Sequence, residues 1–346
     1  MVFSKILKSS LLPLTVMVVA ALGYYLYYNT YFGMDSTRRV QSRAEEVVQS
    51  AYFMCQVTER LLQKRANDLI VAMEEAASML GEPSLGPGRQ NWEVRSPEDG
   101  QTRNVSLAPL RLYHQSSETR ELSTLVTLIM RRTGGEITVL QNLNQRGDQV
   151  KVFCTLDSIS GPQQVTTLVP GQLPGGQPDI FLEPLSRGEV VIRPELVHGR
   201  LYLSIYRPLR EGRKTIGSLV LHVKDQNLDR LRENLLQLNV GRTGYVFALK
   251  ATGAQRGHYA ISSGGLRDGE DIWRATDAAG RPIIRSLINQ ALNLNPHKKR
   301  ISVPIAFERY PWKNPGEVHA RYKTSAITYF EPWDWAIGAG YYEDEF

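Results

Sequence analysis

The sequence predicts an α+β fold in which one long N-terminal helix carries two successive units of antiparallel sheet. Three observations lead to this prediction. Residues 36–80 contain neither Gly nor Pro and show helical apolar spacing. Strand-like segments joined by short polar turns follow residue 135. Strand-like segments occur again after residue 240. Strands that follow one another through short turns pair antiparallel, so a doubly wound parallel sheet is not expected.

The composition is that of a folded globular chain. The 346 residues suggest about two domains, and 42% hydrophobic with 22% charged residues argues against disorder. The net charge of +6 is mild and dispersed, so nucleic acid is not expected as a partner. Two cysteines exclude a disulfide framework and a structural zinc site. Cys55 and Cys154 could form one disulfide, but their unlike surroundings favour two unpaired, buried residues.

The first segment is apolar enough to cross a membrane. The run from Leu11 to Phe32 carries no charge and would measure about 33 Å as a helix, against a hydrocarbon core of about 30 Å. We expect residues 1–35 to form an N-terminal tip and a transmembrane anchor, whose orientation the flanking charges alone do not fix. A signal peptide cleaved near Ala21 is the alternative. Either segment directs the remaining chain across a membrane, and no second apolar run of spanning length occurs in the sequence.

Residues 36–80 are expected to form a continuous helix. Apolar residues recur on one stripe, for example at Val40, Val47, Met54 and Leu61. Such a helix would measure about 68 Å, more than a small domain needs, so it is expected to pack beside both sheet units. It could also form the seam of a homodimer, although its heptad pattern lapses.

The next elements follow from turn signals and spacing. Residues 81–103 are rich in Gly, Pro and polar residues and are predicted to be a loop. Beyond them the sequence predicts helices over 118–132 and 225–239, and two hairpins that pair 136–144 with 149–157 and 200–208 with 215–223.

The second unit again combines strand-like segments with a helix. We predict a strand over 244–250, a helix that starts at Pro282, and closing strands over 300–308, 320–331 and 334–342. The predicted organisation is residues 1–35 as tip and anchor, 36–239 as stalk helix with a distal module, and 240–346 as a proximal module.

Catalytic and metal-binding motifs are absent from the sequence. There is no phosphate-binding loop, zinc-hydrolase motif, nucleophile elbow or EF-hand, and the six histidines are never at ligand spacing. We therefore expect no enzymatic activity, no metal and no cofactor, and a secreted hydrolase is disfavoured. Asp268 and Glu270 are interpreted as turn residues, and the acidic run 343–345 as a solvated terminus.

Aromatic residues and cations gather near the C-terminus. Trp273, Trp312, Trp333 and Trp335 are four of the five tryptophans. Rings that exclude water around a few cations suit a small anionic or zwitterionic ligand. The alternative is a core with aromatic residues at its edge, in which Arg and Lys at alternate positions of a strand share one face.

Several strings resemble a known family. Residues 241–249, 255–273, 307–317 and 329–346 resemble the membrane-proximal module of a fused double Cache sensor, in which a type-three Cache module precedes a type-two module. Residues 138–152, the strand with Tyr202, Tyr206 and Pro208, and residues 215–224 are similar to the distal module of that family.

The resemblance implies PAS-like antiparallel sheets and a small-molecule sensor domain of bacterial chemoreceptors or histidine kinases. It also implies a single-pass protein of the inner membrane, with residues 33–346 periplasmic or extracellular. In the family a second membrane helix and a cytoplasmic output module normally follow the acidic string at 343–346, so a separate signalling partner is one expectation. The alternative is a stand-alone anchored binding protein that presents its ligand to another receptor or transporter.

The predicted proximal site combines Arg256 or Lys323 as cations with Tyr245, Tyr310 and Trp312 as walls. The expected ligand is a small carboxylate or an amino-acid-like metabolite, because a cation in a dry pocket makes a strong hydrogen bond to a carboxylate.

A distal site is expected around Tyr202 and Arg207. Arg207 stands where family members tend to have glutamate, which reverses a charge beside the distal pocket. For this reason the proximal module is the preferred binding site.

Overall fold

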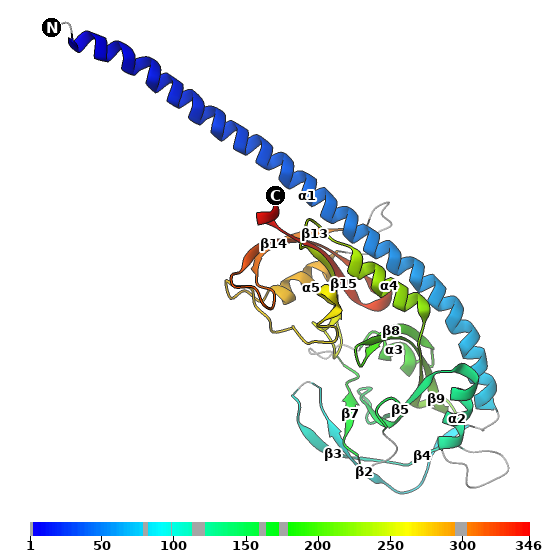
Figure 1. Cartoon of the computed structure of the whole chain (residues 1–346). Helices are drawn as coiled ribbons and strands as arrows, with labels where there is room; N and C mark the ends of the chain where they lie inside the picture. Colours follow the sequence, from blue (N-terminus) through cyan, green and yellow to red (C-terminus); the bar gives the residue numbers. More distant parts are fainter. Residues whose placement is uncertain are drawn as a thin grey trace.

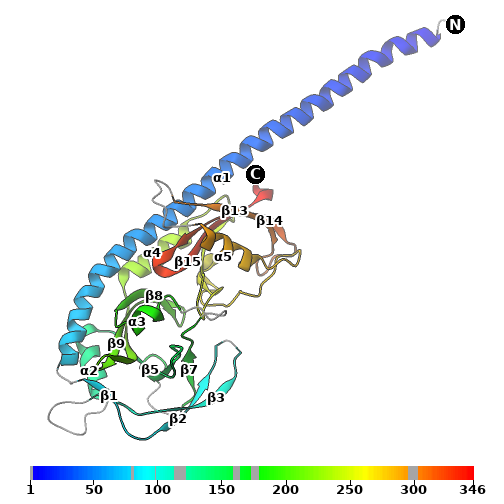
Figure 2. The ribbon, with the colours of Figure 1, turned by 180° about the vertical axis from the view of Figure 1, so that it is seen from behind.

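The computed structural model has a helix followed by two sheets. It describes residues 3–78, 82–97, 99–112, 122–158, 164–172, 179–294 and 303–346, with side chains from residue 38 onward apart from those of residues 77, 112 and 122–125. Helix α1 (Phe3–Ser78) runs along both sheets, and the two views from opposite sides agree on this arrangement (Figures 1 and 2).

Helix α1 is continuous through the stretch that lacks Gly and Pro. Its stripe of small and branched residues, including Ala44, Ala51, Leu62 and Ala66, is buried. The helix contacts α2 and β9 on the distal side and β14 and β15 on the proximal side. The prediction of one continuous helix packed beside both sheet units is therefore confirmed.

The predicted anchor over residues 11–32 lies outside the residues whose side chains are described. Among the helices of the described residues, none combines the length and the apolar character needed to span a membrane.

The distal sheet has eight strands in the order β3-β2-β7-β6-β5-β10-β9-β8. Its pairs are antiparallel except for the parallel pair β2 and β7. Strands β1 and β4 form a separate two-stranded sheet. The bounds are β1 Pro83–Leu85, β2 Gln90–Arg95, β3 Thr102–Leu107, β4 Leu110–Leu112, β5 Glu136–Asn142, β6 Gln149–Cys154, β7 Thr166–Val169, β8 Val191–Val197, β9 Arg200–Glu211 and β10 Lys214–Val223.

The prediction of a loop over 81–103 is wrong. Strands β1 and β2 lie in this range, and β3 begins at its end. In β2 the buried Trp92 and Val94 alternate with exposed neighbours. This period-two pattern spans too few residues to stand out among the flanking Gly and Pro residues.

Helices complete the distal side. Helix α2 (Leu122–Thr133) ends where Gly134 adopts a positive φ of 67° and its amide bonds the carbonyl of Met130. The first residues of the predicted helix 118–132 lie outside the described residues. Helix α3 (Leu182–Ser186) is a short segment over the sheet. Helix α4 (Gln226–Gln237) begins at Asp225, whose side chain accepts the Asn227 amide at 2.8 Å, and it links the two sheets.

The proximal sheet has five antiparallel strands in the order β12-β11-β15-β14-β13. Helix α5 (Ile283–Asn293) follows Pro282 as predicted. The first closing strand begins later than expected, at Ala306, and residues 300–302 lie outside the described ranges. The bounds are β11 Tyr245–Lys250, β12 Tyr259–Ile261, β13 Ala306–Trp312, β14 Arg321–Phe330 and β15 Trp335–Tyr342.

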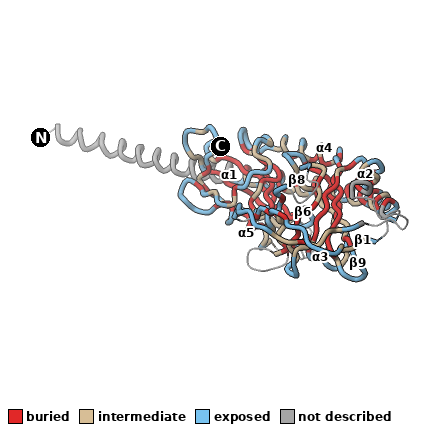
Figure 3. Tube along the Cα trace, turned by 90° about the horizontal axis from the view of Figure 1, so that it is seen from below, coloured by how far each residue is buried: buried red, intermediate tan, exposed pale blue. Residues whose placement is uncertain are grey.

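The main hydrophobic core runs the length of the molecule between α1 and one face of each sheet, and Figure 3 shows buried positions concentrated along the strands. A second core lies between α5 and the other face of the proximal sheet. Cys55 and Cys154 are buried and unpaired, as expected. On the face of the distal sheet that points away from α1, helix α3 packs in a third, smaller core. The cavity described below lies on the same face.

Candidate ligand cavity between the two sheets

A cavity of about 690 Å³ lies on the distal sheet face opposite α1. Strand alternation places the two faces: Leu203 and Ile205 pack into the α1 core, whereas Tyr206 and His222 face the cavity. Strands β5, β8, β9 and β10 form one wall, and α3 with its preceding turn forms another. Residues of the proximal side, including Lys250 and the turn 252–256, complete the enclosure.

A compact charged cluster lies on the sheet wall. The Arg193 guanidinium donates to Glu195 at 2.6 Å and to the Tyr206 hydroxyl at 3.1 Å, and Tyr206 donates to Glu195 at 2.6 Å. Burial disfavours the charged carboxylate, but Arg193, His222, Lys250 and the Tyr206 hydrogen bond together outweigh burial and lower the pKa of Glu195 to about 2. Arg193 also stacks over the Phe181 ring at 4.2 Å. Its Nε is buried without a hydrogen-bond partner, so one donor of this cluster remains available.

His222 forms a hydrogen-bond network next to this cluster. His222 Nδ1 is 2.8 Å from Ser204 Oγ, and its Nε2 is 3.0 Å from Thr138 Oγ1, which contacts Cys154 Sγ at 3.2 Å. Burial lowers the pKa of His222, which favours the neutral ring.

This network lacks the geometry of a hydrolase triad. In a triad the serine and the acid bind opposite ring nitrogens of the histidine. Here Glu195 is 3.9 Å from Nδ1, the same nitrogen that Ser204 contacts, and Ser204 does not line the cavity. The network therefore ties four strands together rather than activating a nucleophile.

The proximal wall presents a buried cation. Lys250, at the end of β11, is 8% exposed and lines the cavity. Its Nζ lies 3.5 Å from the Trp333 carbonyl and 5.8 Å from the centre of the Trp335 ring. Burial, followed by the nearby Arg193 charge, lowers the pKa of Lys250 to about 8.

Asp334 lies beside Lys250 on the same wall. It has a left-handed backbone with φ of 56° and accepts hydrogen bonds from the Thr252 amide, the Thr252 hydroxyl and the Tyr329 hydroxyl at 2.8–3.0 Å. Burial raises the pKa of Asp334. Because its oxygens already accept these bonds, Asp334 holds the turn at the cavity wall.

The predicted site residue Arg256 lines the rim of this cavity. Its guanidinium stacks on the Trp273 ring at 4.5 Å, and Arg285 lies over the same ring at 5.3 Å. Nearby His258 has a buried Nδ1 without a partner. Of the seven residues proposed from the sequence, all of them described, Arg256 alone lines this cavity.

The other predicted proximal residues meet inside the proximal module. Lys323 is 1% exposed, whereas its neighbour Tyr322 is 51% exposed, as strand alternation requires. The Lys323 Nζ lies 3.6 Å from the centre of the Tyr245 ring, and burial holds the pKa of this lysine well below its usual value. Tyr310 and Trp312 pack edge to face with centres 6.1 Å apart.

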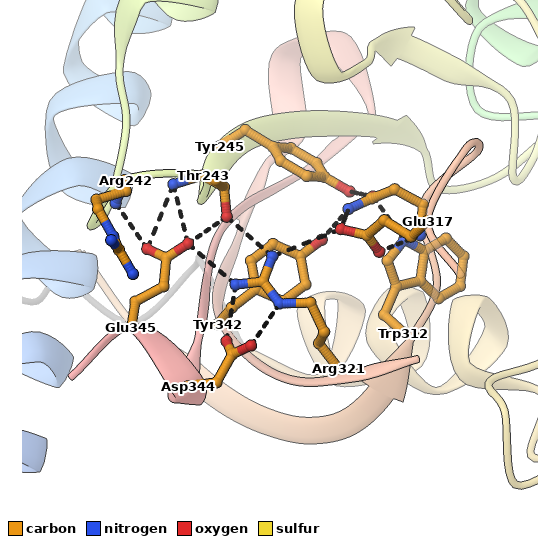
Figure 4. Close-up of polar contacts among 10 residues, drawn as sticks. Arg242, Thr243, Tyr245, Trp312, Glu317, Arg321, Tyr342, Asp344 and Glu345 are labelled. Atoms are coloured by element: carbon orange, nitrogen blue, oxygen red, sulfur yellow. Dashed lines mark hydrogen bonds and ion pairs between the residues drawn. The ribbon is translucent and has the colours of Figure 1, made fainter. Parts of the chain in front are cut away.

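Asn314 joins two of these predicted walls. Its side-chain oxygen accepts from the Tyr245 hydroxyl at 3.1 Å and from Trp312 Nε1 at 3.2 Å, and its amide donates to the Tyr342 hydroxyl at 2.6 Å. Figure 4 shows Tyr245 and Trp312 converging on this point. The polar groups of Tyr245 and Trp312 that sequence analysis assigned to a ligand are thus bonded to Asn314 instead.

The predicted distal residues lie beside the cavity, not in its lining. Tyr202 is buried and packs edge-on to His222, with ring centres 6.5 Å apart. Arg207 follows Tyr206 directly and therefore projects to the opposite face of β9. The lining residues that sequence analysis missed include Arg193, Glu195 and Lys250. The alternation Arg-Pro-Glu in a strand-like segment was the available signal for the first two.

The acidic C-terminus is not simply solvated, contrary to expectation. Arg321 forms a two-pronged pair with Asp344 at 2.7 and 2.8 Å, and Arg309 forms another with Glu343 at 2.7 Å. Glu345 is buried and accepts the Arg242 amide at 2.6 Å (Figure 4). The run folds back onto the start of the proximal module, which charge composition alone does not reveal.

The fold is one long helix that carries two larger sheets with a cavity between them. Residues 32–346 match the Cache 3/Cache 2 fusion domain, and the chain therefore belongs to this family. The predicted resemblance is confirmed. Cache domains are sensor modules that bind small ligands and are generally non-catalytic.

Several solved structures match this chain at low sequence identity. The extracellular domain of the putative histidine kinase mmHK1S-Z2 is 11% identical over 88% of this chain and 98% of its own, with a TM-score of 0.41. The ligand-binding domain of Mlp24 with asparagine is 13% identical over 90% and 95%, with a TM-score of 0.38. A methyl-accepting chemotaxis protein from Vibrio parahaemolyticus RIMD 2210633 is 23% identical over 34% and 71%, with a TM-score of 0.27. No curated protein gave a significant match.

Proposed function

We propose that this chain is the extracytoplasmic, small-molecule-sensing domain of a bacterial membrane receptor in chemotaxis or two-component signalling, without enzymatic activity. The observation that carries the proposal is the cavity of about 690 Å³ bounded by both sheets. Its volume lies within the range of pockets that enclose small metabolites. Membership of the Cache family and the apolar segment over 11–32 support the placement of the domain outside a bacterial inner membrane.

The ligand class follows from the charges of the cavity wall. Arg193 and Lys250 are cations, and Glu195 and Asp179 are carboxylates. A wall with both signs suits a small molecule that itself carries a carboxylate and a cationic group, or a carboxylate with hydrogen-bond donors. We therefore propose an amino-acid-like or small carboxylate metabolite as the ligand, bound here rather than around Lys323.

A route from the cavity to the stalk supports a signalling role. The turn Glu331–Trp333 lies between Asp334 on the cavity wall and helix α1. Trp333 Nε1 donates a hydrogen bond to Glu59 of α1, and Phe330 packs edge to face on Tyr52 of α1 at 5.3 Å. Ligand binding that shifts this turn would bias the position of α1 between two arrangements.

A homodimer through the stalk is part of the proposal. Phe53, Val57 and Leu61 recur every four residues on α1 and remain exposed. They border a shallow groove shared with α4. A second copy of the chain in this position would cover an apolar stripe that water now contacts.

The proposal is tested by a thermal-shift screen of the full chain in detergent against the twenty L-amino acids and against acetate, propionate, lactate, malate, succinate and citrate. We expect at least one compound to raise the melting temperature, since a ligand at 100 times its Kd stabilises by about 2.7 kcal/mol. Glu195→Gln should abolish the rise, while the exposed control Glu189→Gln should retain it. Absence of any rise, or a rise that Glu195→Gln leaves intact, would contradict the proposal.

A further inference from the structure

Lys250 is a buried cation of the cavity that forms no ion pair with another described residue. Arg193 is paired with Glu195 at 2.6 Å, and Lys151 is paired with Asp157. By contrast, within the described ranges Lys250 Nζ forms no ion pair, and its one hydrogen bond, to the Trp333 carbonyl, is long at 3.5 Å. A buried charge without a partner is costly, so such a group marks a place where an anion would be stabilised.

The charged groups that face Lys250 are already engaged. They are Arg193, Asp334, Glu195 and Asp179. The Asp334 oxygens accept three hydrogen bonds, and one oxygen of Asp179 accepts the Phe181 and Leu182 amides at 2.8 and 3.2 Å. Glu195 is held by Arg193 and Tyr206.

The backbone fixes the position of Lys250. Its amide donates to the His258 carbonyl at 2.9 Å, and the next amide, of Ala251, donates to the Asp334 carbonyl at 2.9 Å. Lys250 also stands opposite Trp335 in the pairing of β11 with β15. A rigid strand end therefore presents the ammonium group to the cavity.

We infer that Lys250 anchors the carboxylate of the ligand, so that one bound molecule joins the proximal sheet to the Arg193–Glu195 cluster of the distal sheet. This inference rests on the proposed function. It adds the residue that makes the cavity specific for anionic ligands. The ligand then contacts β11 directly, and β11 pairs with β15, which leads to the C-terminus. Occupancy of the cavity is thereby transmitted to the proximal sheet without a second binding site.

The first arm of the test uses the compounds of the thermal-shift screen and isothermal titration calorimetry on the full chain. Lys250→Met should weaken binding of a carboxylate hit ten- to hundredfold, whereas Lys250→Arg should retain most of the affinity because its charge is kept. The control Lys214→Met, on the exposed end of β10, should leave affinity unchanged. Equal affinity in Lys250→Met and wild type overturns the inference while the proposed function stands.

The second arm needs no ligand and tests whether Lys250 lacks a compensating charge in the empty cavity. The pKa of Lys250, about 8 in the folded chain, lies below its ordinary value of 10.5, so the folded state disfavours the proton. The unfavourable contribution of Lys250 to stability should therefore diminish as pH increases from 8 to 10.5. Lys250→Met should melt higher than the wild type at pH 7, with the difference shrinking toward pH 10.5. A lower melting temperature at every pH would show that Lys250 is already compensated by the protein, which overturns the inference.

Discussion

At the scale of residues, two buried lysines occupy contrasting surroundings. Lys250 borders a cavity and faces carboxylates on the opposite wall, whereas Lys323 is enclosed by the rings of Tyr245, Phe247 and Tyr342. Aromatic faces stabilise a cation without leaving room for a ligand. The two lysines therefore predict different responses to the same substitution.

Lys323→Met should raise the free energy of unfolding at pH 7, because burial disfavours the protonated form of this lysine and an apolar side chain of similar size carries no such cost. The pKa of Lys323 is well below its usual value, so the gain should shrink as pH rises toward that value. Thermal melts at several pH values measure this effect, and calorimetry should show unchanged ligand affinity. If instead the free chain melts as before and the ligand-induced rise is lost, the site lies in the proximal module, as the sequence analysis preferred.

Sequence analysis identified Arg256 and Lys323 but neither Arg193 nor Lys250, the two buried cations of the cavity wall. The alternation around Lys323 predicted correctly that Tyr322 faces the other way. The pairing of Arg193 with Tyr206 depends on strands β8 and β9 lying side by side, and the approach of Lys250 depends on how the two modules pack. Such contacts between distant segments are fixed by tertiary structure, which local periodicity does not contain.

At the scale of elements, the turn Glu331–Trp333 connects the cavity to α1. Trp333 and Trp335 have rings 5.0 Å apart, yet they differ in one bond: Trp333 donates to Glu59, and Trp335 Nε1 is buried without a partner. This difference offers a matched pair of variants.

Trp333→Phe should destabilise the chain by about 1.5–3 kcal/mol, the usual range for a hydrogen bond to a charged group, while Trp335→Phe loses no such bond and should cost less. Urea unfolding of both variants measures the difference. Amide exchange in α1 around residues 52–62 should also become independent of ligand in Trp333→Phe. Retention of the ligand effect in this variant would rule out the turn as the connection.

The stalk helix offers a second prediction at this scale. Ala66 is fully buried in the middle of α1. Ala66→Pro removes a helical hydrogen bond and should cost about 3 kcal/mol or more, against about 1 kcal/mol for the control Ala66→Gly. Circular dichroism during thermal melting measures both values, and equal losses would show that helix continuity at this point does not matter. The continuity itself was predictable because Gly and Pro are absent over residues 36–78.

At the scale of the whole molecule, the exposed stripe of α1 is the surface available to a second copy. Val57→Cys should form a disulfide-linked dimer under mild oxidation, whereas Glu74→Cys, an exposed position off this stripe, should not. Non-reducing electrophoresis of the full chain reads out the result, with the buried Cys55 and Cys154 unreacted. Equal cross-linking at both positions, or none at Val57→Cys, would contradict a homodimer through this stripe.

The central claim is that one ligand binds between the two sheets. Hydrogen–deuterium exchange of the full chain, with and without a compound found in the thermal-shift screen, tests it most directly. We expect ligand-dependent protection in β8 (Val191–Val197) and, in the same sample, in residues 250–256. Protection confined to residues 306–323 of the proximal module, or to the distal strands without residues 250–256, would contradict a shared cavity.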